Sequence, residues 1–192
     1  RAEARRVLRS PDARSGMGLR DRALLEMFYS SGLRLAEMSR LTLADVDLRG
    51  GTARVVNGKG RRDRVAPMGR RAGEALERYL REARAVWVTA RGAWSDALWL
   101  SHRQPHSPLK KEAVAVIARR HARAVLRRTV SPHRWRHAFA THLVSAGASL
   151  VHVQRLLGHR SIKTTEIYAR VTVPELKATL RRFHPRERLR AA

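Results

Sequence analysis

Residues 131–143 read SPHRWRHAFATHL and contain the clearest helix start in the chain. Ser131 is a favourable N-cap and Pro132 suits the first helical position, so the sequence predicts a helix that runs from here to Gly147. His133 and Arg136 are three residues apart, so their side chains share one face of this helix. Both belong to the first turn, where free backbone N–H groups and the positive helix end favour an anion. The stretch therefore predicts a phosphate site at the start of this helix.

Two other interpretations of this stretch are open at this point. His133 can be a capping or packing histidine, with Arg136 an ordinary surface charge. His133 and His137 also have the i, i+4 spacing of a helical zinc site, but the zinc-peptidase pattern requires a glutamate directly after the first histidine. Arg134 occupies that position and would repel a divalent cation. We therefore expect no metal.

The remaining pattern predicts an α+β fold, mostly α-helical, with a small three-stranded antiparallel sheet. The pair Gly50-Gly51 and the run Asn57–Gly60 predict the turns of the sheet, with Lys59 at a hairpin tip. Residues 85–107 predict an irregular segment. The expected strands cover 45–48, 52–56 and 64–67, and the other expected helices cover 20–30, 33–41, 70–84, 110–127, 149–158, 161–171 and 174–183.

Net charge is the strongest signal in the composition. The chain has 41 Lys and Arg residues against 16 Asp and Glu residues, a formal charge of +25, which indicates a polyanionic partner such as nucleic acid. The arginine excess is also what a GC-rich genome would produce, so charge alone indicates no activity. The chain has no cysteine, which excludes disulfides and thiolate sites. No apolar run approaches the roughly 20 residues of a membrane span, so we expect no membrane partner.

A second candidate phosphate ligand lies far from the first in sequence. Arg34 follows Gly32 and Leu33 at an expected helix start, and Glu37 lies one turn further on. The pair can be an ordinary surface ion pair worth a few tenths of a kcal/mol. It can also be a second guanidinium for the phosphate, oriented by Glu37, because two arginines can grip both non-bridging oxygens.

Five motifs occur in order along the chain: SGLRLAE (31–37), GKG (58–60), HRWRHAFATHL (133–143), LLGH (156–159) and TEIY (165–168). Together they resemble the motif set of the tyrosine recombinases, the phage integrase family, most closely the Xer-type recombinases and the integron-type integrases. The resemblance covers about residues 17–184. Trp135 departs from the pattern, because Xer-type members usually have a smaller aliphatic residue there.

The resemblance implies a catalytic set, and Glu37 is expected to support it. The implied residues are Arg34, Lys59, His133, Arg136, His159 and the nucleophile Tyr168, of which Arg34, Lys59, Arg136 and His159 would also contact DNA. Lys59 would protonate the leaving oxygen, while His133 would either assist proton removal from Tyr168 or donate to the phosphate. No cofactor, metal or ATP is expected, since the phosphotyrosyl link stores the energy of the phosphodiester bond that was broken and allows rejoining.

The resemblance also implies an organisation. We expect a linker remnant over 1–14, a catalytic domain over 15–184, and no N-terminal core-binding domain in this chain. The C-terminal helix and tail, 174–192, carry an apolar stripe of Leu176, Leu180 and Phe183, which can dock on a neighbouring protomer or pack on its own domain. The implied partner is double-stranded DNA, bound by a homo- or hetero-tetramer on synapsed sites, and the implied location is the cytoplasm, at a bacterial or archaeal nucleoid.

The expected function is site-specific DNA recombination through a 3′-phosphotyrosyl intermediate. Chromosome or plasmid resolution, an integron role and mobile-element integration are all compatible with these motifs. Two alternatives are relaxation of supercoils by a type IB topoisomerase and a non-catalytic, sequence-specific DNA-binding module. The short spacing from His159 to Tyr168 favours a recombinase over a topoisomerase, and mere DNA binding needs no tyrosine nucleophile.

Overall fold

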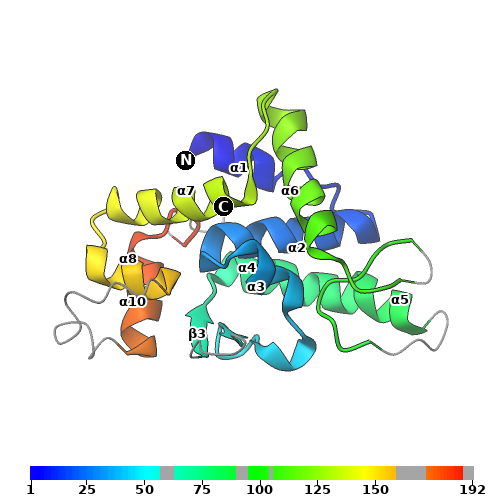
Figure 1. The fold of residues 1–192 in the computed structure, drawn as a ribbon, viewed down its shortest axis with the longest axis horizontal. Coiled ribbons are helices and arrows are strands. Elements are labelled where there is room, and N and C mark those ends of the chain that lie inside the picture. Colours follow the sequence, from blue (N-terminus) through cyan, green and yellow to red (C-terminus); the bar gives the residue numbers. More distant parts are fainter. Residues whose placement is uncertain (57–62, 90–94, 104–105, 159–171, 188–192) are drawn as a thin grey trace.

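The computed structural model describes residues 1–56, 63–89, 95–103, 106–158 and 172–187 (Figure 1). Within these ranges the strands β1 (Val46–Asp47), β2 (Thr52–Val55) and β3 (Arg64–Pro67) form an antiparallel sheet in the order β1-β2-β3. The helices are α1 (Ala2–Leu8), α2 (Gly16–Ser31), α3 (Leu35–Arg40), α4 (Arg70–Tyr79), α5 (Ala85–Thr89), α6 (Lys111–Leu126), α7 (Pro132–Val144), α8 (Leu150–Leu157) and α10 (Val173–Phe183). The predicted α+β class is confirmed.

Helix α2 lies at the centre of the described fold, with α4 on one side and α7 on another (Figure 1). It is buried along almost its whole length, and Leu24, Leu25 and Phe28 have no exposed surface. Because residues on every side of α2 are covered, its sequence shows only a weak amphipathic pattern. No helix among the described residues combines the length and apolar character that a membrane span requires.

A second apolar cluster joins α7, α8 and α10, which lie together at the left of Figure 1. Phe139 and Leu143 of α7 pack here with Leu156 of α8. From α10, Leu176 and Leu180 are buried in the same cluster, and Phe183 packs against its edge. The predicted apolar stripe of the C-terminal helix therefore packs on its own domain in this single chain.

The chain beyond α10 is anchored to α2. His184 is completely buried, and its Nε2 lies 3.0 Å from the carbonyl oxygen of Tyr29. Arg186 forms a buried ion pair with Glu26, with its Nε 3.0 Å from Oε2. These contacts fix residues 184–187 against the middle of the domain, so transfer of this segment to a neighbour would require both contacts to open.

We expect the buried histidine to make stability depend on pH. Burial lowers the pKa of His184 from 6.5 to about 4, so the folded protein holds it neutral while the unfolded chain takes up a proton below pH 6.5. Its contribution is complete above pH 6.5 and is lost as the pH falls towards 4, by about 3 kcal/mol in total. Urea unfolding at pH 7 and pH 4.5, compared between wild type and His184→Gln, measures it. Equal pH dependence in both proteins would contradict this assignment.

Two segments differ from the sequence-based expectation. Residues 1–14 are not a plain linker, because α1 places Val7 and Leu8 in the core, and Arg6 donates to the carbonyl oxygen of Val125 in α6 at 2.9 Å. The segment 85–107 is not irregular throughout, since the helix of α4 continues through a π-type turn over Leu80–Arg84 into α5. Residues 1–14 contain many arginines and read as polar, although the apolar Val7 and Leu8 are the buried residues of α1.

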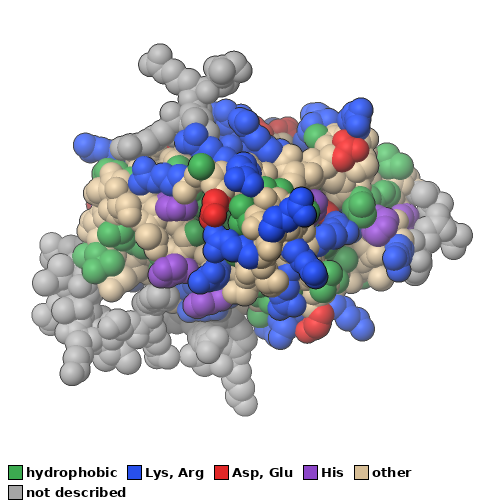
Figure 2. Space-filling model, turned by 90° about the horizontal axis from the view of Figure 1, so that it is seen from above, with side chains coloured by type: hydrophobic (Ala, Val, Ile, Leu, Met, Phe, Trp, Pro, Cys, Tyr) green, Lys and Arg blue, Asp and Glu red, His purple; other side chains and the backbone are tan. Residues whose placement is uncertain are grey.

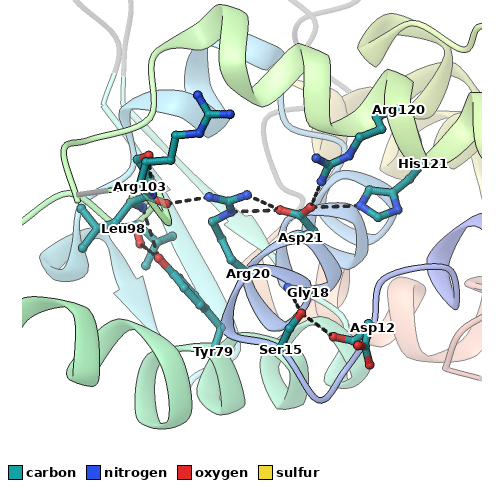
Figure 3. Close-up of polar contacts among 12 residues, drawn as sticks. Asp12, Ser15, Gly18, Arg20, Asp21, Tyr79, Leu98, Arg103, Arg120 and His121 are labelled. Atoms are coloured by element: carbon teal, nitrogen blue, oxygen red, sulfur yellow. Dashed lines mark hydrogen bonds and ion pairs between the residues drawn. The ribbon is translucent and has the colours of Figure 1, made fainter. Parts of the chain in front are cut away.

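A buried ionic cluster ties α2 to α6. Asp21 is 1% exposed and lies between Arg20 on one side and Arg120 and His121 of α6 on the other (Figure 3). Its Oδ1 accepts from Arg20 Nη2 at 2.6 Å, and its Oδ2 lies 3.0 Å from His121 Nε2. Burial raises the pKa of Asp21, but the bond from His121 and the charge of Arg20 outweigh this effect, so the pKa lies below its ordinary value.

Replacing Asp21 by asparagine should therefore lower the free energy of unfolding by about 3 kcal/mol. The change leaves three cationic or donor side chains around a neutral amide, and removing one partner of a buried ion network is strongly destabilising. Urea unfolding at pH 7 measures the loss. Glu74→Gln, in the half-exposed pair with Arg70, is the matched control and should cost about 0.5 kcal/mol or less. A loss at Asp21 no larger than this control would contradict a stabilising role for the cluster.

Candidate functional site

Arg136 is buried near the start of α7, one turn after His133, and holds two chain segments together. Its Nη1 donates to the carbonyl oxygen of Gly32, at the end of α2, and its Nη2 donates to that of Leu157, at the end of α8. The residue is 6% exposed. Arg136 thus lies at the start of two turns. One is at Gly32 and leads to Arg34, and the other is at Gly158, which precedes His159 in the sequence.

The turn at Gly32 delivers Arg34 to this site. Gly32 has a φ of +62°, and a Cβ there would lie 2.8 Å from the ring of Phe139, so only glycine fits. Arg34 follows as the N-cap of α3, and Glu37 closes the cap by accepting from the backbone N–H of Arg34 at 2.7 Å. The predicted partnership of Arg34 and Glu37 is present in the structure.

Glu37 is shared by two guanidinium groups. Its Oε1 accepts from Arg34 Nη1 at 2.8 Å, and its Oε2 accepts from Arg64 Nη2 at 3.0 Å. The Glu37 side chain is 8% exposed, whereas that of Arg34 is 42% exposed. The Glu37 carboxylate therefore binds Arg34 from the protein interior, while part of the Arg34 side chain stays exposed and can contact a ligand from solvent.

The charge balance of this site favours an additional anion. The pKa of Arg136 is lowered to about 10, chiefly by burial, with the charges of Arg34 and Arg64 contributing and that of Glu37 opposing the shift. Burial also lowers the pKa of Arg64. The arginines stay protonated at neutral pH, so the described part of the site has three guanidinium groups around one carboxylate. A bound phosphate would relieve this imbalance.

The other predicted residues relate to the cluster as follows. His133 is exposed in the first turn of α7, one turn before Arg136. Lys59, His159 and Tyr168 lie outside the described residues. Lys59 belongs to the connection between β2 and β3, whose last register pair is Val55 with Arg64. His159 directly follows Gly158, the C-cap of α8.

The start of α7 agrees with the prediction in position but not in detail. Ser131 is the N-cap and Pro132 the first helical residue, but the Ser131 hydroxyl makes no capping bond. The described residues contain no group of three or more histidine, aspartate or glutamate side chains placed to hold a metal ion. The groups that this part of the site offers to an anion are guanidinium groups and the backbone N–H groups at the start of α7.

Arg64 is the site residue that sequence reasoning missed. It lies in β3 between the exposed Asp63 and Val65, and its side chain is only 16% exposed. The available signal was an arginine at an inward position of a short strand, five residues after a motif lysine. In a chain with this many arginines that signal carries little information.

One face of the described fold is strongly basic. Figure 2 shows the face that carries α1, α6 and α7, where Lys and Arg side chains are many and acidic ones are few. The exposed arginines of α1 and α6 and of the turns that follow them include Arg6, Arg9, Arg119, Arg120, Arg123, Arg127 and Arg128. Such a surface attracts a polyanion at long range.

Comparison with known proteins places this chain in a family. A sequence model of the phage integrase family matches residues 2–175. The chain belongs to the phage integrase family. Among curated members of the phage integrase family, the tyrosine recombinase XerD of Ralstonia nicotianae is 42% identical over 186 residues, and the tyrosine recombinase XerC of Pelotomaculum thermopropionicum is 41% identical over 187 residues.

Each of these alignments covers 96% of this chain, but 59% of the XerD and 60% of the XerC relative, so the chain spans about three fifths of their length. Solved structures of the family agree. The XerA recombinase matches with a TM-score of 0.71 at 26% identity over 99% of this chain and 63% of its own. The integrase of mycobacterium phage Brujita matches with a TM-score of 0.71 at 25% identity, over 100% of this chain and 58% of its own.

Proposed function

We propose that this chain is the catalytic part of a site-specific DNA recombinase that joins a tyrosine to DNA. The observation that carries the proposal is the guanidinium cluster of Arg34, Arg64 and Arg136 around Glu37, in a chain of the phage integrase family. A cluster with surplus positive charge fits a phosphodiester whose transition state gains negative charge on its non-bridging oxygens. Its curated relatives are named tyrosine recombinases, which supports the same activity.

The nucleophile in this proposal is Tyr168. The chain has three tyrosines, and the other two are poor candidates. Tyr29 and Tyr79 have no exposed surface, and burial raises the pKa of each to about 12. A nucleophilic phenol must reach the DNA and ionise as it attacks, so these two positions are unsuited. The TEIY motif adds independent support for Tyr168.

The reaction then proceeds by transesterification. The Tyr168 oxygen attacks the scissile phosphorus, the bond to the 5′-oxygen breaks, and a 3′-phosphotyrosyl link forms. Lys59 donates a proton to the leaving 5′-oxygen, and His133 accepts the phenolic proton or donates to the phosphate. Arg34, Arg136 and His159 hold the non-bridging oxygens. The reverse attack by a 5′-hydroxyl restores the DNA, so no energy source is consumed.

We propose that four chains, of one kind or two, assemble on two synapsed DNA sites. The likeness to XerC and XerD favours resolution of chromosomes or plasmids in the cytoplasm, and mobile-element integration is the second role of the same chemistry. The basic face of α1 and α6 supports DNA as the partner. In this assembly the segment 174–192 would be exchanged with a neighbour only after the Arg186–Glu26 pair opens.

Covalent capture of DNA tests the proposed function. The full-length protein is incubated with nicked fragments of its source genome, and only protein-linked DNA is recovered under denaturing conditions. We expect adducts on a small set of related sequences, and sequencing them identifies the target site. Binding without any adduct would overturn the recombinase assignment in favour of a DNA-binding module. Exchange of strands between two captured sites, rather than relaxation alone, separates a recombinase from a topoisomerase.

A further inference from the structure

We propose that Arg64 is a positioning residue that fixes the Glu37 carboxylate and thereby sets the guanidinium of Arg34. This inference rests on the proposed function, since it concerns how that site is held in shape. Three contacts connect these residues in series. The turn at Gly158 packs against Arg64, Arg64 binds Glu37, and Glu37 binds Arg34.

The first link is the close approach of α8 to β3. Gly158 has a φ of +63°, and a Cβ built there would lie 2.4 Å from Arg64 Nε and 2.7 Å from its Cδ. The absence of a side chain at this position thus makes room for the Arg64 side chain, not only for the left-handed turn. Since Arg136 binds the carbonyl of Leu157, the turn that backs Arg64 is itself held by the site.

The second link is the bond to Glu37. Arg64 Nη2 lies 3.0 Å from Glu37 Oε2, on the oxygen that also accepts the backbone N–H of Arg34. The other oxygen of Glu37 binds the Arg34 guanidinium at 2.8 Å. The Glu37 carboxylate is therefore bound both by Arg34, at the N-cap of α3, and by the Arg64 side chain of β3. Without Arg64, only the contacts with Arg34 would fix the plane of the carboxylate.

Arg64 is not explained by stability alone. Its Nε and Nη1 are buried, and among the described residues no acceptor binds either of them. At a position with a purely structural role, a buried cation with unsatisfied donors lowers stability, and an apolar side chain of similar size would give a more stable fold. Because these two donors are enclosed and Nη2 is committed to Glu37, Arg64 does not face solvent as Arg34 does. This favours action through Glu37 over direct contact with DNA.

The test uses the full-length protein and a nicked form of the DNA site recovered by covalent capture. Single-turnover cleavage and DNA affinity are measured for wild type, Arg64→Lys and Arg54→Lys. Lysine keeps the charge but cannot reproduce the geometry of the guanidinium. We expect Arg64→Lys to slow cleavage on the order of 10²-fold, as for a misplacement of about 1 Å, with affinity changed by less than about threefold. Arg54 of β2, whose exposed side chain pairs with Asp45, is the matched control, and its replacement should leave both unchanged.

A double-mutant cycle with Glu37→Gln tests the route. If Arg64 acts through the carboxylate, then Arg64→Lys should cost less than about threefold further in a Glu37→Gln background, because the coupled pair is already broken. Wild-type cleavage by Arg64→Lys would overturn the proposal, and so would fully additive losses. Failure of wild type itself to form an adduct would instead overturn the proposed function, before any variant is compared.

Thermal melting of each variant accompanies the kinetics. If Arg64→Lys fails to fold, Glu37→Asp replaces it. Aspartate keeps the charge but withdraws the carboxylate by one methylene from Arg64, so it should reproduce the loss of cleavage with Arg64 intact. Cleavage by Glu37→Asp at the wild-type rate would overturn the proposal.

Discussion

Replacing Tyr168 by phenylalanine should abolish the covalent protein–DNA adduct while leaving DNA affinity within about twofold of wild type. The substitution removes one oxygen atom from the chain. Ionising a phenol of pKa about 10 at pH 7 costs on the order of 4 kcal/mol. In the proposed function, the surplus positive charge of the arginine cluster lowers that cost and stabilises the phosphate as charge develops. Without the phenolic oxygen, Arg34 and Arg136 should still bind the phosphate, but no nucleophile is left to attack it.

The other two tyrosines supply the matched controls. Tyr79→Phe removes a buried hydroxyl that donates to the carbonyl oxygen of Leu98 at 3.2 Å, and Tyr29→Phe removes one that lies 2.8 Å from His142 Nδ1. Both variants should still form the adduct if they fold. Denaturing gels with labelled DNA measure the adduct, and titration at fixed salt measures affinity, which is strongly salt-dependent for so basic a protein. An adduct that survives in Tyr168→Phe would disprove the assignment of the nucleophile.

Replacing Arg136 by alanine should have the second largest effect, with cleavage slowed by about 10²–10³-fold or more. In the proposed function the guanidinium supplies charge to the scissile phosphate, and in the structure it binds the carbonyls of Gly32 and Leu157. We therefore expect a second consequence, a loss of roughly 2 kcal/mol or more in unfolding free energy, because two carbonyl oxygens lose their donor. Single-turnover cleavage and urea unfolding measure the two effects separately.

The Arg136→Lys variant separates the effect of positive charge from the effect of the carbonyl bonds. Lysine keeps a positive charge at the site but cannot bind both carbonyls with a planar fork, so cleavage should stay well below wild type. Arg134→Lys, an exposed substitution on the same helix, is the control and should change neither cleavage nor stability. Cleavage at the wild-type rate in Arg136→Ala would remove this residue from the site.

Much of the fold follows from local signals in the sequence. Ser131 and Pro132 mark the start of α7, Gly158 marks the end of α8, and the strand predicted over 64–67 has the observed bounds of β3. These signals are local because each depends on the backbone freedom of one or two residues. The pairing of Arg34 with Glu37 was predictable for the same reason, since it lies within one helical turn.

Other features depend on partners distant in sequence. Helix α1 offers only Val7 and Leu8 to the core, and its burial arises from contact with α6, more than a hundred residues further on. The role of Arg64 depends on Gly158, which lies 94 positions away and has no side chain to show in any pattern. Such features become visible only when the tertiary structure brings the two segments together.

The carbonyl bonds of Arg136 have a consequence for the interpretation of degenerate members of the family. A descendant that lost its tyrosine and persisted as a DNA-binding protein would still need this arginine to join the ends of α2 and α8. Selection for folding would then retain it long after selection for strand cleavage had ceased. Arginine at this position in a diverged sequence therefore attests to an intact domain, whereas Arg34, half-exposed and bound through one carboxylate, is the more sensitive marker of lost activity.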